Sequence, residues 1–438
     1  MMALKYTALR LIGVATALLL LTFPTGGSLN AAQATATNTP APAPAKQIVA
    51  YFASWDAYGR NYSPAQIPVS KLTMINYAFA RPAMDGGCAI GDAQVDTNKY
   101  FPGDNNTDPG ALHGNFAQLL QMRKANPALG VSISIGGWNW SDQFSRISRT
   151  ADGRQKFVAA CIAMFIKGEL PAITGGFKGL FDGIDIDWEY PTCCGAQPVG
   201  ADAYSPLDTQ NYTLLLQEFR RQLDVQGAAD GVHYRLTAAL PAGATIYPHI
   251  DLKAAATSLD WLNLMAYDFN GGWEKTTGFN APLYAPDSSA ASQQNNTDSA
   301  VQAYLAAGVP SAKIVLGVPF YTHSWKGVPD VNHGLGQTGS GVPAGTWDDS
   351  SSGATGIQDY ADIVAHYLPK YQRYWSDSAQ VPWLYNAADG IFISYDDPQS
   401  IGIKADYVNK NALGGMMIWE ISSDNGDLLN TIAAKLRP

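Results

Sequence analysis

Short apolar runs recur along the chain, and most of them precede a longer segment in which apolar residues repeat with the period of a helix. Eight of the short runs are rich in β-branched and aromatic residues, so they predict strands over residues 48–54, 72–79, 131–135, 183–188, 234–240, 261–267, 314–319 and 416–419. The longer segments predict helices over residues 112–125, 154–167, 209–225, 299–307, 401–410 and 428–436.

This alternation indicates the α/β fold class. Strands that are apolar almost throughout, separated by helices, are typical of a parallel sheet covered by helices. Eight such units predict a closed (β/α)8 TIM barrel, and a doubly wound open sheet is the alternative.

One gap in the pattern is too long for a barrel connection. Barrels of this type need about 250 residues, so the surplus length belongs to insertions. The longest gap, residues 322–393 between the seventh and eighth strands, contains short alternating segments such as PWLYN and GIFISYDD. Its aromatic content argues against a disordered loop. We expect a small α+β insertion domain on one rim of the barrel.

The first residues have the pattern of an export signal. Lys5 and Arg10 precede the apolar run LIGVATALLLLT, and small residues follow up to Ala34. This pattern predicts a secretory signal peptide over residues 1–34, because twelve apolar residues are too few to cross a bilayer; an uncleaved anchor is the alternative. Residues 35–46 are rich in Pro, Ala and Thr and predict an extended linker. The folded part, residues 47–438, is then secreted and extracellular.

Composition narrows the class of partner. The chain is 46% hydrophobic and 15% charged, with a net charge of −9 and no run of Lys or Arg. It therefore has no basic surface for nucleic acid or an anionic membrane, and a neutral or cationic partner fits better. We expect a monomer that does not associate with a membrane once the signal peptide is cleaved.

Cysteine and histidine spacing gives little sign of a metal site. In an exported chain the four cysteines, Cys88, Cys161, Cys193 and Cys194, predict one or two disulfides among three full connectivities. We expect the adjacent Cys193 and Cys194 to have separate partners, or one of them to stay free. The six histidines show neither an H-E-x-x-H motif nor an i, i+4 pair, so we predict no metal and no other cofactor.

The strand segment FDGIDIDWEYP, residues 181–191, carries four acidic residues. Alternate residues of a strand share a face, so Asp185, Asp187 and Glu189 project together into the barrel, with neighbouring Cβ atoms about 6–7 Å apart. Asp182 has the opposite parity, so its inward placement would need a bend or bulge.

Crowded carboxylates suggest acid catalysis. Like charges held away from water cannot all ionise, so at least one proton is retained, and we expect it on Glu189 at the carboxyl-terminal rim. A carboxylic acid that keeps its proton near neutral pH is a general acid. A divalent-metal site and a solvated acidic rim are the alternatives, but neither explains the aromatic residues nearby.

Aromatic residues gather at the predicted carboxyl-terminal ends of strands, where barrel active sites form: Trp138, Trp140, Trp188, Tyr190, Tyr267, Trp273 and Trp419. One tryptophan alone is more often a core residue. Several rings beside carboxylates suit the apolar faces of sugars, whose hydroxyls then need polar partners such as Asp268. The residues therefore predict acid-catalysed cleavage of a glycosidic bond.

Five motifs follow one another in the chain: SISIGGW (132–138), DGIDIDWEYP (182–191), MAYDFNG (265–271), GVPFY (317–321) and GGMMIWEISSDNGDLLN (414–430). In kind and order they resemble those of family 18 glycoside hydrolases, the chitinases, and specifically bacterial members with a chitinase insertion domain. The resemblance covers the chain after Gln47. It implies chitin or chito-oligosaccharides as the substrate.

The resemblance also implies a retaining mechanism without an enzyme nucleophile. Glu189 would protonate the glycosidic oxygen while the substrate's own N-acetyl carbonyl attacks the anomeric carbon. Asp187 would orient the acetamido group, and Asp185 would share a proton with Asp187. The implied supporting residues are Tyr51 and Ser134, which bond Asp185, together with Asp182; the implied substrate contacts are Tyr267, Trp419, Asp268, Met265, Trp138, Tyr190, Trp273 and Phe79.

One position departs from the family pattern. Many relatives continue the seventh-strand motif with Gly-Arg, whereas this chain has Thr322 and His323, which puts a sugar contact of that arginine in doubt. Two other functions share the fold. A chitinase-like lectin would have replaced Glu189 or Asp187, and both are present. An endo-N-acetylglucosaminidase acting on N-glycans would use the same chemistry, but the insertion and Trp419 favour a linear polymer in a deep cleft.

Overall fold

The structure is a computed structural model that describes residues 45–437 except 109, 171, 174–175, 196–203 and 287–292. The predicted signal peptide, residues 1–34, and all but the last two residues of the predicted linker lie outside the described residues. Within the described part, no helix combines the length and the apolar character needed to cross a membrane.

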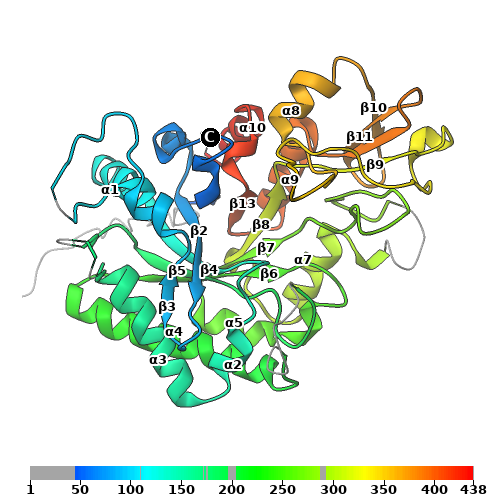
Figure 1. Ribbon diagram of the computed structural model, residues 1–438. Helices are drawn as coiled ribbons and strands as arrows, with labels where there is room; N and C mark the ends of the chain where they lie inside the picture. Colours follow the sequence, from blue (N-terminus) through cyan, green and yellow to red (C-terminus); the bar gives the residue numbers. More distant parts are fainter. Residues whose placement is uncertain are drawn as a thin grey trace, which may run out of the picture. The chain divides into compact units, whose positions relative to one another are not determined.

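Eight parallel strands close into a barrel (Figure 1). They are β1 (Gln47–Ala53), β2 (Met74–Pro82), β4 (Gly130–Gly136), β5 (Gly183–Asp187), β6 (Arg235–Pro241), β7 (Trp261–Met265), β8 (Ile314–Pro319) and β13 (Gly415–Trp419). The first strand pairs with both β2 and β13, which closes the ring. Each strand overlaps a predicted one, and the (β/α)8 TIM barrel is confirmed.

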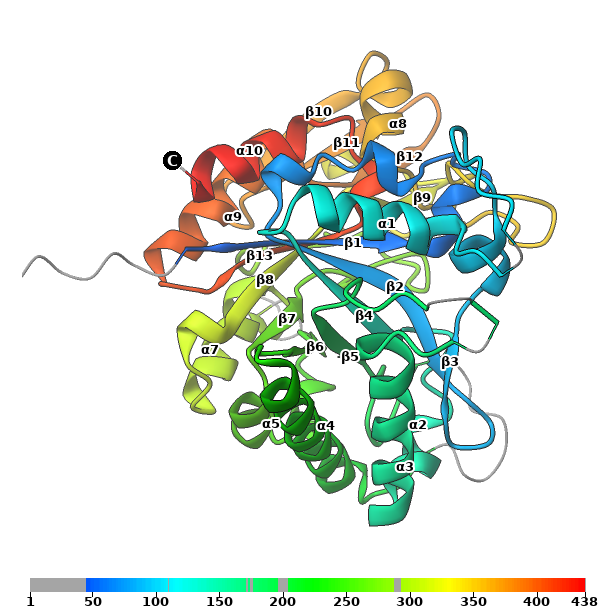
Figure 2. The ribbon, with the colours of Figure 1, turned by 90° about the vertical axis from the view of Figure 1, so that its left-hand side faces the viewer.

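Helices surround the barrel (Figure 2). At the predicted positions lie α1 (Gly114–Ala125), α3 (Ala151–Cys161), α4 (Asp208–Asp230), α7 (Thr297–Ala306), α9 (Pro398–Lys410) and α10 (Asp427–Leu436). Among the described residues, three short α-helices were not predicted: α2 (Phe144–Ser148), α5 (Leu252–Ser258) and α8 (Tyr360–Asp362). These three are too short to display a helical repeat in the sequence.

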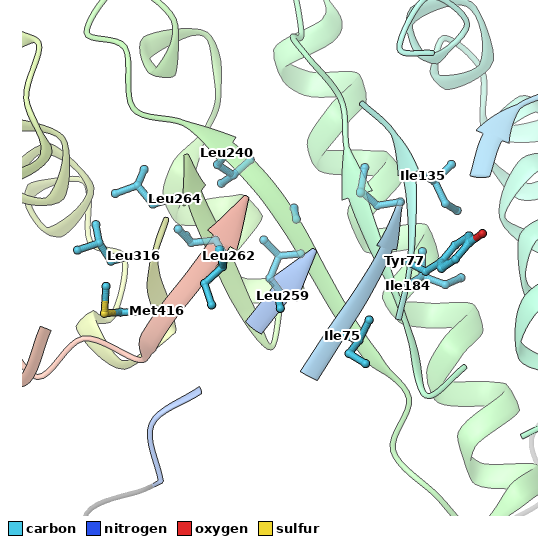
Figure 3. Packing of buried hydrophobic residues seen from close by; sticks show 14 of the residues in the cluster. Ile75, Tyr77, Ile135, Ile184, Leu240, Leu259, Leu262, Leu264, Leu316 and Met416 are labelled. Carbon is cyan, nitrogen blue, oxygen red and sulfur yellow. The ribbon is translucent and has the colours of Figure 1, made fainter. Parts of the chain in front are cut away.

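The main core lies between the strands and the helices. Alternate strand residues such as Ile184, Leu240 and Leu264 point outward and pack in this core (Figure 3). The opposite alternation points into the barrel, where Val49, Met417 and their neighbours form a second apolar cluster. Because each barrel strand is buried on both faces, an acidic residue can enter the barrel interior only with hydrogen-bonding partners.

The long gap before the eighth strand contains a second sheet. Its four antiparallel strands are β9 (His323–Lys326), β10 (Gln372–Ser376), β11 (Val381–Asn386) and β12 (Ile391–Ser394), in the order β10-β11-β12-β9. The sheet has an apolar cluster of its own, formed by Phe279, Trp325, Val328, Ala379, Val381, Trp383, Tyr385 and Phe392. This arrangement is α+β, as predicted, and Figure 1 shows it in yellow and orange.

The disulfides correct a prediction. Cys88, in the short strand β3 (Cys88–Ile90) that pairs with β2, is bonded to Cys161 at the end of α3. Cys193 and Cys194 are bonded to each other, so the expectation of separate partners or a free thiol was wrong. The reason is local: Cys194 has a left-handed backbone, with φ of 52°, in a tight loop after β5.

Removing the longer-range disulfide should destabilise the fold. The Cys88–Cys161 bond joins residues separated by 73 positions. Replacing both cysteines with Ser should lower the free energy of unfolding by about 4 kcal/mol, because the cross-link restricts the unfolded chain. Urea titration measures this. The matched control is the double Ser variant of Cys193 and Cys194, whose bond closes no long loop; equal losses in the two variants would contradict the prediction.

Candidate active site

Asp185 lies at the centre of the barrel and is fully buried. Its Oδ2 accepts hydrogen bonds from the hydroxyls of Tyr51 and Ser134, both at 2.7 Å. Its Oδ1 accepts from Thr237 at 2.6 Å and from the amide of Asn263 at 3.1 Å. The four donors come from β1, β4, β6 and β7. Burial raises the pKa of Asp185, and the hydrogen bonds oppose that rise by stabilising the carboxylate.

Asp187 lies one step further along the same face and is also buried. Burial raises its pKa well above the usual range, and the neighbouring charges of Glu189 and Asp185 raise it further. Its Oδ1 is buried, with no hydrogen-bond partner among the described residues. Since a buried carboxylate oxygen rarely stays unpaired, this atom is available to a ligand.

Glu189 follows the end of β5 and is partly exposed. Burial raises the pKa of Glu189 to about 7. A hydrogen bond from Tyr190 lowers this pKa, and the negative charge of Asp268 raises it. A carboxyl with this pKa is present in both its protonated and its ionised form near neutral pH, so it can both donate and accept a proton. In the part of the chain that the structure describes, no group of three or more His, Cys, Asp or Glu side chains is placed to hold a metal ion.

The turn after β4 holds the backbone of the acidic strand. The N–H of Gly137 donates to the carbonyl oxygen of Asp187 at 2.8 Å, and the N–H of Glu189 donates to the hydroxyl of Ser141 at 2.9 Å. A Cβ on Gly136, where φ is +115°, would lie 2.2 Å from the carbonyl oxygen of Asp187. Glycine is therefore required at this close approach. Ser141 was missed in the sequence because it lies outside the motif.

Two residues after β7 complete the polar side of the site. Burial and the nearby charge of Asp268 raise the pKa of Tyr267 well above its usual value, so its hydroxyl stays protonated and can donate. Asp268 Oδ1 accepts hydrogen bonds from Tyr321 at 2.5 Å and from His323 Nε2 at 2.8 Å. The left-handed backbone of Asp268, with φ of 59°, is fixed by its N–H bond to Asn280 Oδ1.

These side chains border a cavity of about 570 Å³. Ten predicted residues line it: Tyr51, Phe79, Trp138, Asp187, Glu189, Tyr190, Met265, Tyr267, Asp268 and Trp419. Trp419 forms an aromatic wall, with the ring centroids of Phe79 and Tyr51 at 5.7 and 5.4 Å. Trp140, one of the aromatic residues expected at the rim, also lines the cavity, whereas Trp55 and Tyr321 were not predicted as site residues.

Other residues singled out in the sequence lie outside the cavity lining. Asp185 and Ser134 lie behind it, inside the barrel. Trp273 is 62% exposed and meets His323 edge to face. Trp188 packs against Phe144 in the outer core. Asp182 precedes β5, pairs with Arg123 and accepts from the N–H of Val131, as its opposite parity would suggest.

Two buried donors were also missed, although the sequence carried a signal for them. Thr237 lies in the strand RLTAALP and Asn263 in the strand WLNLM, each a polar residue at an inward position of an apolar strand. A buried polar residue needs a hydrogen-bonding partner, and the only charged inward residues predicted were those of β5. Parity therefore marks Thr237 and Asn263 as inward donors for a carboxyl of β5, but it does not say which of the three carboxyls they bind.

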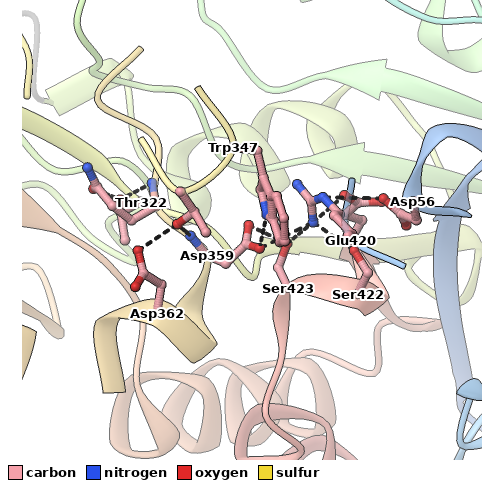
Figure 4. A network of polar contacts seen from close by, with 11 residues as sticks. Asp56, Thr322, Trp347, Asp359, Asp362, Glu420, Ser422 and Ser423 are labelled. Carbon is pink, nitrogen blue, oxygen red and sulfur yellow. Dashed lines mark hydrogen bonds and ion pairs between the residues drawn. The ribbon is translucent and has the colours of Figure 1, made fainter. Parts of the chain in front are cut away.

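A polar network surrounds Glu420, the residue that follows Trp419 in the chain (Figure 4). The guanidinium of Arg60 is 2.9 Å from Glu420 Oε1 and 3.4 Å from Asp359 Oδ2. Ser423 donates to Asp359 Oδ1 at 3.0 Å, and the indole of Trp347 donates to Asp359 Oδ2 at 2.5 Å. The network therefore joins the end of β13 to the insertion, and it fixes the backbone directly after Trp419.

Comparisons with known proteins agree with this geometry. Residues 47–424 match the model of glycosyl hydrolases family 18. The chain is 41% identical to Chitinase A1 of Niallia circulans over 89% of its own length and 58% of the relative's, and 35% identical to Endochitinase 1 of Metarhizium robertsii over 88% and 84%. It thus spans little more than half of the Niallia protein. The structure of chitinase ChiA74 from Bacillus thuringiensis superposes with a TM-score of 0.82 at 37% identity, covering 90% of this chain and 70% of that one.

Replacing Ser141 with Ala tests the backbone support of Glu189. The change leaves the partly buried N–H of Glu189 without its acceptor, so the free energy of unfolding should fall by about 1 kcal/mol. Denaturant titration measures the loss. Ser148→Ala is the control, because this buried hydroxyl donates only to the Ser145 carbonyl at 3.3 Å. If both variants were equally stable, the Ser141 contact would not support the strand.

Proposed function

Because the chain belongs to glycosyl hydrolases family 18, we propose that it is a chitinase, which hydrolyses β-1,4-linked N-acetylglucosamine polymers by a retaining, substrate-assisted mechanism. The observation that carries the proposal is the buried row of carboxylates. It ends at Glu189, whose pKa lies near 7, inside a cavity walled by aromatic rings. The two relatives described above are named Chitinase A1 and Endochitinase 1.

Glu189 acts first as the general acid. Its proton passes to the glycosidic oxygen as the bond from that oxygen to the anomeric carbon breaks. The carbonyl oxygen of the sugar's own acetamido group forms the new bond to the anomeric carbon, which gives a cyclic oxazolinium ion. No protein nucleophile is needed, and the shortened polymer leaves as the alcohol.

Asp187 stabilises this cation. Its unpaired Oδ1 accepts a hydrogen bond from the acetamido N–H. Once the proton that its raised pKa retains has passed to Asp185, the negative charge of Asp187 balances the positive charge of the ring. Asp185 shares a proton with Asp187 through the barrel interior, while its own four donors keep it in place. Tyr267 donates to the acetamido carbonyl and directs the attack, and Trp419 supports the apolar face of the same sugar.

The second step reverses the roles. Ionised Glu189 removes a proton from water, the water oxygen bonds to the anomeric carbon, and the oxazolinium ring opens to restore the acetamido group. Two successive inversions leave the configuration retained. A carboxyl with a pKa near 7 suits both steps, since it must be an acid in one and a base in the other.

The exposed aromatic residues favour a polymer. Trp55 and Trp138 are about half exposed in the cavity wall, and Trp273 lies beyond the lining. Rings that continue past a single sugar site suit a chain of sugars. We further propose that the enzyme is exported as a monomer and that residues 322–393 form a domain that deepens the cleft.

Glu189→Gln tests the assignment of the acid. The amide keeps the shape of the side chain but has no acidic proton, so kcat on the N-acetylglucosamine tetramer should fall by about a thousandfold or more. Binding of the tetramer, followed by calorimetry, should change little, because the other contacts remain. Product analysis by mass spectrometry measures turnover, and a glycoprotein substrate distinguishes the endo-N-acetylglucosaminidase alternative. Substantial residual turnover would show that another group donates the proton.

The pH profile tests the pKa of Glu189. The free enzyme needs protonated Glu189, so kcat/KM should decline above about pH 7, where this acid loses its proton. The charge of Asp268 helps raise the pKa, so Asp268→Asn should move this alkaline limb to lower pH. Initial rates on the tetramer between pH 5 and pH 9 measure both profiles. An unmoved limb in Asp268→Asn would show that the limb belongs to another group.

A further inference from the structure

His323 is the first residue of β9 and comes from the insertion, not from the barrel. Its ring is buried, and it does not line the cavity. Its Nε2 lies 2.8 Å from Asp268 Oδ1. The acceptor is a carboxylate oxygen, so Nε2 carries the hydrogen and donates.

Asp268 receives its side-chain support on one oxygen only. Tyr321 and His323 both donate to Oδ1, at 2.5 and 2.8 Å. The Oδ2 of Asp268 has no hydrogen-bond partner among the described residues, and the carboxyl borders the cavity with about half of its side-chain surface exposed. Two donors on one oxygen fix the orientation of the carboxyl and leave the other oxygen for a ligand.

The imidazole is itself held from several sides. The ring of Trp273 meets it edge to face, with centroids 5.0 Å apart, and Tyr321 does the same at 5.7 Å. The backbone of His323 is paired with Ser394 of β12, and the hydroxyl of Ser394 accepts from the N–H of Asn280. Asn280 in turn holds the backbone N–H of Asp268. The insertion sheet therefore supports both the side chain and the backbone of Asp268.

We propose that His323 is a positioning residue for substrate binding: it holds Asp268 so that Oδ2 accepts a hydrogen bond from a sugar group in the cavity. This rests on the proposed function. His323 itself makes no sugar contact and acts through Asp268. The insertion would therefore take part in substrate recognition by orienting a barrel carboxylate, although none of its own residues 322–393 lines the cavity.

Steady-state kinetics on the N-acetylglucosamine tetramer test the proposal. His323→Ala leaves Tyr321 as the remaining side-chain donor to Asp268 Oδ1, so the carboxyl is held less firmly. We expect kcat/KM to fall about tenfold, mostly through a higher KM, because the sugar then meets a less well oriented acceptor. His323→Gln should recover most of the loss, since its amide can donate from nearly the same place. His323→Asn is too short to reach and should resemble His323→Ala.

A double-mutant cycle separates positioning from a general structural effect. In an Asp268→Asn background, His323→Ala should cause less than about a twofold further loss, because its target has been altered. The matched control is His366→Ala, which removes an imidazole bonded to Asp362 in the same insertion but outside the cavity lining; it should leave kcat/KM unchanged. Thermal unfolding of each variant shows whether the fold is kept.

The possible failures are distinct. Independent, multiplying losses from His323→Ala and Asp268→Asn would overturn the positioning role, and so would a Gln variant no better than the Asn variant at equal thermal stability. If His323→Ala did not fold, the comparison of Gln with Asn would still decide. A wild-type enzyme that does not cleave the tetramer would instead overturn the proposed function.

Discussion

The hydrogen bonds to Asp185 are the constraint on which the site depends. A carboxylate at the centre of a closed barrel is stable only if its oxygens are satisfied, and four donors from four strands satisfy them. Because these donors belong to different strands, the strand register and the position of Asp185 determine each other. Asp187 and Glu189 follow at intervals of two residues, and their depth in the barrel is then fixed.

Strand parity carried much of the prediction. Alternation on β5 placed Asp185, Asp187 and Glu189 on one face and Ile184 and Ile186 on the other, and the structure has this arrangement. The strand-helix rhythm indicated the barrel because eight apolar runs were found and most were followed by a helical segment. Parity likewise separated Asp182, which lies just before β5 and pairs with Arg123. The local pattern of apolar residues is thus sufficient to predict an element where either the strand alternation or the helical repeat dominates the segment.

What the sequence could not supply are pairings between distant segments. Ser141 supports Glu189 across 48 positions, and His323 reaches Asp268 across 55. Neither residue has a neighbour in sequence that would distinguish it from a surface serine or a core histidine. The prediction for Cys193 and Cys194 failed for another reason. In the structure Cys194 has a left-handed backbone, which a residue other than glycine rarely adopts. Such pairings become visible only when the fold brings the segments together.

The raised pKa values that make the site reactive also reduce its stability at high pH. A carboxyl whose pKa is higher in the folded than in the unfolded chain contributes stability below its unfolded pKa and loses that contribution as pH rises through the folded value. For Glu189 this loss of stability occurs between about pH 4.5 and about pH 7. Asp56, raised to about 10 by burial and the charge of Glu420, extends it further. The ion pair between Arg60 and Glu420 offsets part of this cost beside Trp419. The insertion supplies Asp359 to this network and His323 to Asp268, so it contacts charged groups at two places near the cavity.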